Sequence, residues 1–420
     1  MFTQLLHPGF KGYRLLDLTR LLPGPYASFL LSNLGIEVIK IEEPGRGDYL
    51  RSYPPFLNGV SVFFQTINYG KKSLALNLKH PEGREIFKRL VQESDVLLEG
   101  FRPGTMEKLG LSYPELSKIN PNLIFCSLTG YGQEGPWSNK AGHDLNYIAL
   151  SGLLGLMARR NDRPVIPAIP IADLVGGTFA ALAIVSALLA RQAGGSGQYL
   201  DLAMLDGLLS WLSWPLAEFR TTGSVARGGQ GLLSGGVVCY NVYRTKDNRY
   251  LTLAALEEKF WAQFCRVTEK PELLPEQFAP ATDGEPVYER MKALFAGRTL
   301  DEWLELDSQG DLCLAPVLDM PEVLDHPQVK ARGVTETFGR VLFNSHLLDQ
   351  PQVQGRGMTE NFGRVFYDSH LMDPPQAKAR GVTDTTLSSP RLGQHTAELL
   401  ANLGYTVEQI RELQEKEVIA

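Results

Sequence analysis

A regular alternation of short apolar runs with helical segments begins at Tyr13 and limits the possible folds more than any other feature of the chain. A Pro-Gly-Pro turn at residues 23–25 leads into a helix that ends at Gly35, and Pro81 opens the helical segment 82–95. The strand-like runs are residues 14–20, 37–45, 73–79, 96–101 and 122–132. Strands joined by crossover helices predict a Rossmann-like parallel α/β sheet, in which ligands bind at the carboxyl ends of the strands.

The size and charge of the chain limit its organisation and its ligands. A chain of 420 residues is longer than one hydrophobic core usually serves, so we expect two domains. A net charge of −6 argues against nucleic acid and membrane surfaces as partners, and any anionic ligand must be held by a local group of cations. No G-x-G-x-x-G motif follows the first strand, so we do not expect a nicotinamide or flavin dinucleotide.

The cysteines and the N-terminal segment indicate a cytoplasmic protein. Cys126, Cys239, Cys265 and Cys313 are scattered without CxxC spacing, which is typical of reduced thiols and predicts neither disulfides nor zinc. The first 20 residues lack the pattern of a signal peptide. The most apolar run, residues 179–190, has about half of the roughly 20 residues that span a bilayer, so we expect a buried helix there.

A glycine-rich stretch, residues 227–236, marks the expected domain boundary. The large α/β domain is predicted over residues 1–222 and a smaller α+β domain over residues 232–334. The small domain should begin with a β-hairpin over residues 237–256, followed by a helix over 257–268.

A short internal repeat follows. Its three copies begin at Asp325, Asp349 and Asp373, 24 residues apart. Three copies are too few to define a solenoid, so we interpret residues 325–384 as a duplicated helix and loop inserted into a globular scaffold. The histidines that two of the copies carry do not predict a metal site by their spacing alone.

Five motifs, taken in order, resemble one known family. They are NYGKKSLALNLKHPEG (68–83), LLEGFRPGTMEKLGL (97–111), GHDLNY (142–147), ADLVGG (172–177) and AALEEKFW (254–261). Together they are similar to the CaiB/BaiF superfamily of class III CoA-transferases, and in particular to its α-methylacyl-CoA racemase branch. The similarity runs from about Tyr13 to Val334 and resumes at residues 388–405, so only the repeat departs from it.

The resemblance implies a two-domain subunit whose large domain is closed by C-terminal residues 385–420. It also implies that two chains interlock as a homodimer, with the active site between the large domain of one subunit and the small domain of the other. The expected ligand is an acyl-CoA thioester. Coenzyme A is part of that substrate, and we expect no other cofactor and no metal.

His143 and Asp144 precede a helical segment, and each has two interpretations. A histidine can act as a base near neutral pH, but it can equally be a polar residue at a helix start. The resemblance favours the base, because transferase members commonly carry a non-basic residue where the racemase branch has this histidine. Asp144 either orients the imidazole or caps the helix, and Tyr147 is expected to support the site.

Asp173 and Glu257 both lie at predicted helix starts. Asp173 precedes the helix 174–192, where it can cap the first turn and where the helix dipole should keep its carboxylate ionised. The resemblance makes it the nucleophile of transferases and a proton-transfer residue of racemases. Glu257 completes the proton-transfer set of the racemase branch, although Glu258 beside it leaves open which glutamate enters the site.

A coenzyme A site needs cations for its pyrophosphate and 3′-phosphate. The residues that the resemblance assigns to this site are Leu21, Leu22, Pro23, Leu76, Lys79, Gly100, Phe101, Arg102 and Lys108. Many relatives carry an arginine after the second strand, where this chain has Glu43. Arg46 or Arg51 is the candidate to take its place.

Two enzyme functions follow from these residues. The first is a racemase that interconverts the (R) and (S) forms of 2-methylacyl-CoA thioesters through an enolate, with a base on one face and an acid on the other. The second is a CoA-transferase in which Asp173 forms a mixed anhydride with the acyl group. A third interpretation is a CoA-binding protein without catalytic activity, in which the repeat disturbs closure of the large domain.

Overall fold

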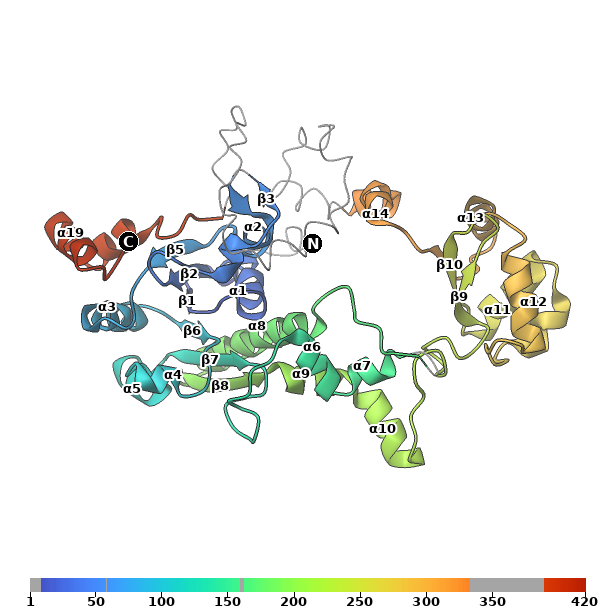
Figure 1. Cartoon of the computed structure of the whole chain (residues 1–420), viewed down its shortest axis with the longest axis horizontal. Coiled ribbons are helices and arrows are strands. Elements are labelled where there is room, and N and C mark those ends of the chain that lie inside the picture. Colours follow the sequence, from blue (N-terminus) through green and yellow to red (C-terminus); the bar gives the residue numbers. More distant parts are fainter. Residues whose placement is uncertain (1–8, 58, 159–161, 333–388) are drawn as a thin grey trace, which may run out of the picture. The chain divides into compact units, whose positions relative to one another are not determined.

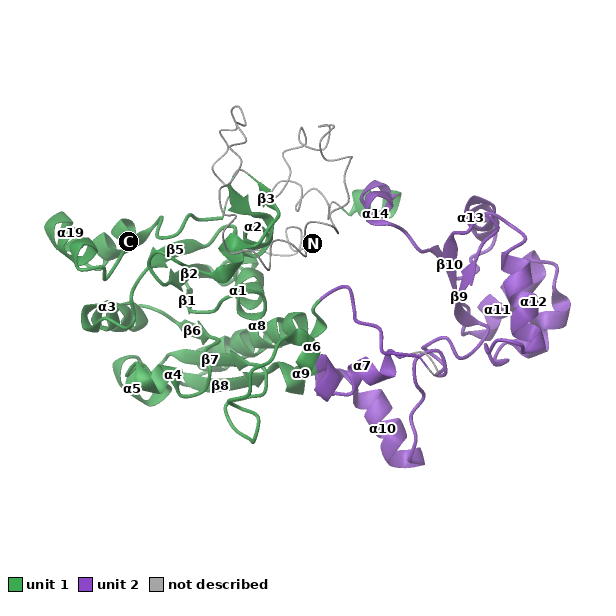
Figure 2. Cartoon of the chain, viewed as in Figure 1, with its two compact units in different colours: residues 1–147, 170–207, 327–420 green, residues 148–169, 208–326 purple. Residues whose placement is uncertain are grey.

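The computed structural model describes residues 9–57, 59–158, 162–332 and 389–420 (Figure 1). They form two compact units (Figure 2). The unit bounds are Met1–Tyr147, Pro170–Gly207 and Pro327–Ala420 for unit 1, and Ile148–Ile169 and Leu208–His326 for unit 2. Most of the predicted repeat insertion, from residue 333 onward, lies outside the described residues.

Unit 1 is built on a six-stranded parallel sheet with the strand order β5-β2-β1-β6-β7-β8. The strands are β1 (Arg14–Asp17), β2 (Glu37–Glu42), β5 (Lys72–Ala75), β6 (Val96–Glu99), β7 (Ile124–Thr129) and β8 (Gln198–Ala203). The predicted parallel α/β sheet is therefore confirmed. The strand order reverses between β1 and β6, and a crevice outside the carboxyl ends of the strands is expected at such a switch point.

Helices cover both faces of this sheet (Figure 1). The helices and short strands of unit 1 are α1 (Pro23–Asn33), η1 (Tyr49–Ser52), β3 (Phe56–Leu57), β4 (Val60–Ser61), α2 (Val62–Asn68), α3 (Pro81–Gln92), α4 (Thr105–Lys108), α5 (Tyr113–Ile119), α6 (Asp144–Leu150), α8 (Ile171–Gln192), α9 (Met204–Trp211), α15 (Pro327–Ala331), α18 (Thr396–Asn402) and α19 (Val407–Glu415). Helix α6 and helix α9 each continue into the start of unit 2.

Helix α8 packs closely against α1. A Cβ atom at Gly177 would lie 2.5 Å from the Pro23 carbonyl oxygen, so only glycine permits this approach. Helix α8 has 22 residues and is long and apolar enough to cross a membrane, and half of its most apolar stretch is buried inside the chain.

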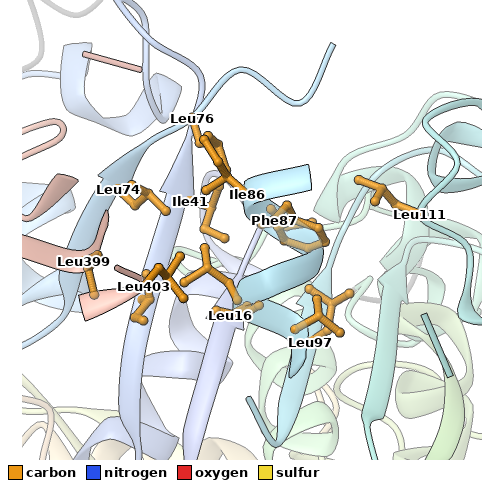
Figure 3. Close-up of a cluster of buried hydrophobic side chains, with 14 of the residues drawn as sticks. Leu16, Ile41, Leu74, Leu76, Ile86, Phe87, Leu97, Leu111, Leu399 and Leu403 are labelled. Carbon is orange, nitrogen blue, oxygen red and sulfur yellow. The ribbon is translucent and has the colours of Figure 1, made fainter. Parts of the chain in front are cut away.

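The C-terminal residues complete the core of unit 1. Leu399 and Leu403 belong to the same buried cluster as Leu16 and Leu74 of the sheet and Phe87 of α3 (Figure 3). The backbone N–H of Ser73 donates to His395 Nδ1 at 3.1 Å, and that of Ala75 donates to Thr396 Oγ1 at 3.1 Å. The segment after residue 389 is thus bonded to the edge strand β5.

Unit 2 contains an antiparallel sheet with the strand order β11-β10-β9. Its elements are α7 (Leu153–Leu156), α10 (Ser213–Thr222), β9 (Tyr240–Arg244), β10 (Tyr250–Ala254), α11 (Glu258–Val267), η2 (Pro271–Glu276), α12 (Pro286–Phe295), α13 (Leu300–Ser308), β11 (Leu314–Pro316) and α14 (Met320–Asp325). The predicted hairpin and the helix after it are confirmed as β9, β10 and α11.

The chain passes into unit 2 earlier than the boundary predicted at residue 222. Helix α9 ends at Trp211 and α10 begins at Ser213, and Pro215 lies in the first turn of α10, where a missing N–H breaks no helical bond. Trp214 and Phe219 of α10 are 75% and 55% exposed within the chain. Because these side chains do not enter the core of the sheet, α10 groups with unit 2.

Candidate active site

A cavity of about 510 Å³ opens in unit 1 at the switch point of the sheet. Its walls come from the loops after β1, β6 and β7 and from the first turns of α1 and α8. The predicted site residues that line it are Leu21, Pro23, Gly100, Phe101, Arg102, His143, Tyr147 and Asp173. Three of the five motifs and the segment between β1 and α1 therefore contribute these eight residues to one cavity.

His143 sits at the start of α6 and lines this cavity. Its backbone N–H donates to Asn146 Oδ1 at 3.0 Å, and its carbonyl accepts the N–H of Asn146 at 2.8 Å. These reciprocal bonds fix the helix start through the backbone. The imidazole takes no part in them, so the same residue serves as a helix-start residue and also lines the cavity.

Tyr147 holds the segment that carries His143. Its hydroxyl donates to the Gly142 carbonyl at 2.6 Å, and its ring meets Tyr131 edge-on at 5.0 Å between centroids. The ring also fills the space that a Cβ atom at Gly130 or Gly142 would need. Burial raises the pKa of Tyr147 to about 12, so its hydroxyl stays protonated at neutral pH.

Asp144 caps the first turn of α8. Its Oδ1 accepts the backbone N–H of Ala172 at 2.5 Å and that of Asp173 at 3.2 Å. Helix α8 begins at Ile171, so Asp173 lies inside the first turn. The interpretation of Asp173 as the capping residue of a helix beginning at residue 174 is therefore wrong, because the cap comes from an aspartate 29 residues earlier.

The pKa of Asp173 is raised from 3.8 to about 7, first by burial and then by the nearby Asp144 carboxylate. The prediction that the helix dipole would keep this carboxylate fully ionised at neutral pH is wrong. The loss of solvation and the negative charge of Asp144 raise the pKa of Asp173 more than the helix dipole lowers it. Both the acid and the carboxylate form of Asp173 are therefore present near pH 7.

Glu257 is the N-cap residue of α11 in unit 2, and Glu258 is the first residue of that helix. Both side chains are exposed within the chain, so exposure does not distinguish them. Among the residues that the structure describes, those that line the unit 1 cavity all belong to unit 1. The predicted role of Glu257 remains a prediction.

Four residues predicted to bind coenzyme A do not line the cavity: Leu22, Leu76, Lys79 and Lys108. The Leu76 side chain is buried in the apolar core. Lys79 is exposed and pairs with Glu43 at 2.8 Å, and Lys108 is exposed at the end of α4. The loop after β6, which places Phe101 at the cavity, is held by Glu99. This buried residue accepts the backbone N–H of Phe101 through its Oε2 at 2.7 Å.

Arg20 lines the cavity and was not predicted from the sequence. Its guanidinium donates to the Tyr49 hydroxyl at 2.9 Å and lies over the Tyr49 and Phe101 rings, 5.1 and 5.9 Å from their centroids. The available signal was an arginine at the end of the first strand-like run, residues 14–20, because that strand end was already expected to face a ligand.

The two candidates to replace the family arginine differ in their contacts. Arg51 is bonded through two nitrogens to Glu42, at 2.7 Å each, so its charge is already paired. Arg46 lies over the ring of Tyr49, 4.6 Å from the centroid. Because Tyr49 lines the cavity, Arg46 is the better placed of the two.

Comparison with known proteins identifies the family. The model of CoA-transferase family III matches residues 10–396. The mouse succinyl-CoA:glutarate CoA-transferase is 36% identical over 330 residues, covering 77% of this chain and 75% of that protein. The human α-methylacyl-CoA racemase is 36% identical over 328 residues, covering 77% of this chain and 81% of that protein.

A solved structure from the same family also matches this chain. The crystal structure of a CaiB/BaiF family protein from Brucella suis superimposes with a TM-score of 0.72 at 28% identity, covering 94% of this chain and 99% of that one. The resemblance seen in the sequence motifs is thereby confirmed. The chain belongs to CoA-transferase family III.

Proposed function

We propose that the chain racemises 2-methylacyl-CoA thioesters by removing the proton next to the thioester carbonyl and returning one to the opposite face. The observation that carries this proposal is that His143 and Asp173 line the same cavity. The two groups of such a pair need opposite protonation states, one ready to accept a proton and the other ready to give one. An aspartate with a pKa of about 7 supplies either state near neutral pH.

The charges around the cavity support an anionic thioester as the substrate. Arg20, Arg102 and Lys140 line it in a chain whose net charge is −6. A local group of cations in an acidic chain suits the pyrophosphate and 3′-phosphate of coenzyme A. In this proposal Glu257, contributed by the small unit of a partner subunit, completes the proton-transfer set.

A CoA-transferase is the second candidate, and the equal 36% identity to a transferase and to a racemase favours neither. In that reaction the ionised Asp173 attacks the thioester carbonyl carbon, and coenzyme A leaves as the thiolate. The thiolate then attacks the aspartyl carbonyl of the resulting mixed anhydride, which releases the first acid as its carboxylate and leaves an aspartyl-CoA thioester. The second carboxylate attacks that thioester and expels the thiolate, which finally attacks the acyl carbonyl of the new anhydride to give the product thioester and free Asp173. This chemistry requires Asp173 but no imidazole at position 143.

One experiment distinguishes the two reactions. The protein is incubated in D₂O with one enantiomer of a 2-methylacyl-CoA and no acceptor acid, and α-deuterium and configuration are followed by NMR. Incorporation of deuterium with loss of configuration supports the racemase. Absence of exchange, together with CoA transfer after a dicarboxylate is added, supports the transferase, and absence of both reactions with CoA binding intact indicates a binding protein.

The first testable prediction is that His143→Ala lowers the exchange rate about 1,000-fold, the range expected for loss of a general base. We expect coenzyme A affinity, measured by calorimetry, to change less than threefold. His80→Ala is the matched control, because His80 is also a helix N-cap residue but does not line the cavity. A His143→Ala variant that keeps full exchange activity would contradict the proposed role of the imidazole.

A further inference from the structure

The loop between β1 and α1, residues 18–22, forms one wall of the cavity in a conformation that needs support. Leu21, at its centre, has φ of 64°. This left-handed region is unfavourable for any residue that has a Cβ atom. The backbone N–H of Leu21 donates to Asp48 Oδ1 at 3.0 Å, which is the bond that holds the residue in this conformation.

Acidic and basic side chains bind the backbone of this loop at three points. Asp48 Oδ1 accepts the N–H of Leu21, and Asp48 forms an ion pair with Lys40 at 2.9 Å. Lys40 Nζ donates to the carbonyl of Thr19 at 2.8 Å. Asp17 Oδ1 accepts the N–H of Thr19 at 2.9 Å.

These charged groups are buried but do not touch the cavity. Lys40 and Asp17 are 0% exposed and Asp48 is 1% exposed, and none of the three lines the cavity. A buried ion pair seldom stabilises a fold more than apolar side chains of similar volume do. Its contacts with the loop backbone therefore suggest a role in shaping the site.

The same carboxylate also orders a second wall. Asp48 Oδ1 accepts the N–H of Leu50 at 3.0 Å and caps the short helix η1. Tyr49, the first residue of η1, lines the cavity and receives a hydrogen bond from Arg20. Asp48 thus joins the Leu21 loop to the Tyr49 wall through a single side chain.

We propose that Asp48 and Lys40 are positioning residues that hold the Leu21 loop and Tyr49 in the conformation that binds the CoA portion of the substrate. This inference rests on the proposed acyl-CoA substrate but not on the choice between racemase and transferase. It assigns the two residues to binding and leaves proton transfer or anhydride formation to His143 and Asp173.

The test is calorimetric titration of free coenzyme A into the full-length protein and its Asp48 variants. Asp48→Ala removes the acceptor of Leu21, and we expect the dissociation constant to rise about tenfold as the binding conformation becomes a minor one. Asp48→Asn keeps an oxygen acceptor at the same place, so its dissociation constant should stay within about threefold of the wild type. With acyl-CoA, Asp48→Ala should raise KM and leave kcat within about twofold.

Asp95 supplies a matched control at the opposite end of the sheet. It also accepts a backbone N–H, that of Arg14 at 2.8 Å, and pairs with a cation, Arg191 at 2.6 Å. Asp95→Ala should lower thermal stability without changing coenzyme A affinity. An equal loss of affinity in Asp48→Ala and Asp95→Ala would overturn the proposal, since both variants would then act through general destabilisation.

The double variant Lys40→Met with Asp48→Leu covers the case in which Asp48→Ala does not fold. It removes both charges, so no buried charge is left unpaired, but it still leaves the Leu21 N–H without an acceptor. A dissociation constant for coenzyme A that rises about tenfold in the double variant supports the proposal, and an unchanged dissociation constant overturns it. If the wild-type protein itself does not bind coenzyme A, the proposed acyl-CoA function is wrong. If the wild type binds and the variants bind equally well, only the positioning role of Asp48 and Lys40 is wrong.

Discussion

Buried charged residues support the β1–α1 loop and η1 beside the cavity of unit 1, whereas aromatic rings fill the interior of unit 2. Asp17, Lys40 and Asp48 are at most 1% exposed beside the carboxyl ends of the parallel strands. In unit 2, the ring of Phe295 stacks on that of Tyr243 with 4.3 Å between centroids, and its centroid lies 4.6 Å from that of the Trp303 ring. Aromatic packing stabilises a domain, while buried charges fix particular backbone groups at a cost in desolvation. The contrast agrees with our proposal that unit 1 binds coenzyme A and that the interior of unit 2 supports its fold.

The largest expected effect is a loss of stability in unit 2. Trp303 is fully buried, and its indole N–H donates to the Phe295 carbonyl at 3.0 Å. Trp303→Ala should lower the free energy of unfolding of unit 2 by about 4 kcal/mol, because it leaves a large cavity. Urea unfolding measures the loss, and calorimetry below the transition should find coenzyme A affinity unchanged. A loss of affinity in the folded variant would break the contrast between the two interiors.

The next effect concerns the surface of unit 2. If Glu257 acts in a site completed by a partner subunit, Asp173→Ala and Glu257→Ala proteins should each be inactive in deuterium exchange. Mixed by co-expression, they should regain about a quarter of the wild-type activity, because half of the dimers then carry one intact site. The same mixing of Asp173→Ala with His143→Ala should restore nothing, since both residues line one cavity of unit 1. Equal recovery in the two mixtures would contradict this division of the site.

The smallest effect is on stability and depends on pH. The pKa of Asp173 is raised from 3.8 to about 7 in the folded chain, so ionisation destabilises the fold as pH rises through this range and the full penalty is present above pH 7. Asp173→Asn should therefore be more stable than the wild type by about 1 to 2 kcal/mol at pH 8, a value reduced for partial solvent exposure. The difference should shrink as pH falls from 7 toward 3.8 and vanish near pH 3, where Asp173 is protonated in both the folded and the unfolded chain.

Thermal unfolding at pH 3, 6 and 8 checks this prediction. A variant that is less stable than the wild type at pH 8 would show that the Asp173 carboxylate is stabilised in the fold. The same variant should lose exchange or transfer activity, which would make Asp173 a residue retained for chemistry at the expense of stability.

Much of the architecture of unit 1 could be predicted from local patterns. The order of strands and helices follows from apolar periodicity and from glycine and proline positions, and a parallel sheet then brings the ends of β1 and β6 together. The motif around His143 and the motif around Asp173 could be assigned only through a family resemblance. Without that resemblance, His143 and Asp173 are each equally consistent with an ordinary residue at a helix start.

Other features of the site depend on contacts between distant segments. The cap of α8 comes from Asp144, 29 residues before Asp173, and no local pattern predicts that pairing. The contact of Arg20 with Tyr49 and Phe101 likewise joins three separate loops. The boundary between the units also differs from the glycine-rich stretch, because packing against the sheet, which α10 lacks, decides where a unit ends.

The sequence by itself determined the parallel α/β sheet, the hairpin of the smaller unit and the motifs of CoA-transferase family III, because each depends on short-range pattern. Only the tertiary structure decided the protonation of Asp173 and the anchoring of the Leu21 loop. The pKa of Asp173 depends on how much solvent and which charges surround its carboxylate. The conformation of Leu21 depends on a hydrogen bond to Asp48, 27 residues away along the chain. Both are properties of groups that meet only when the chain has folded.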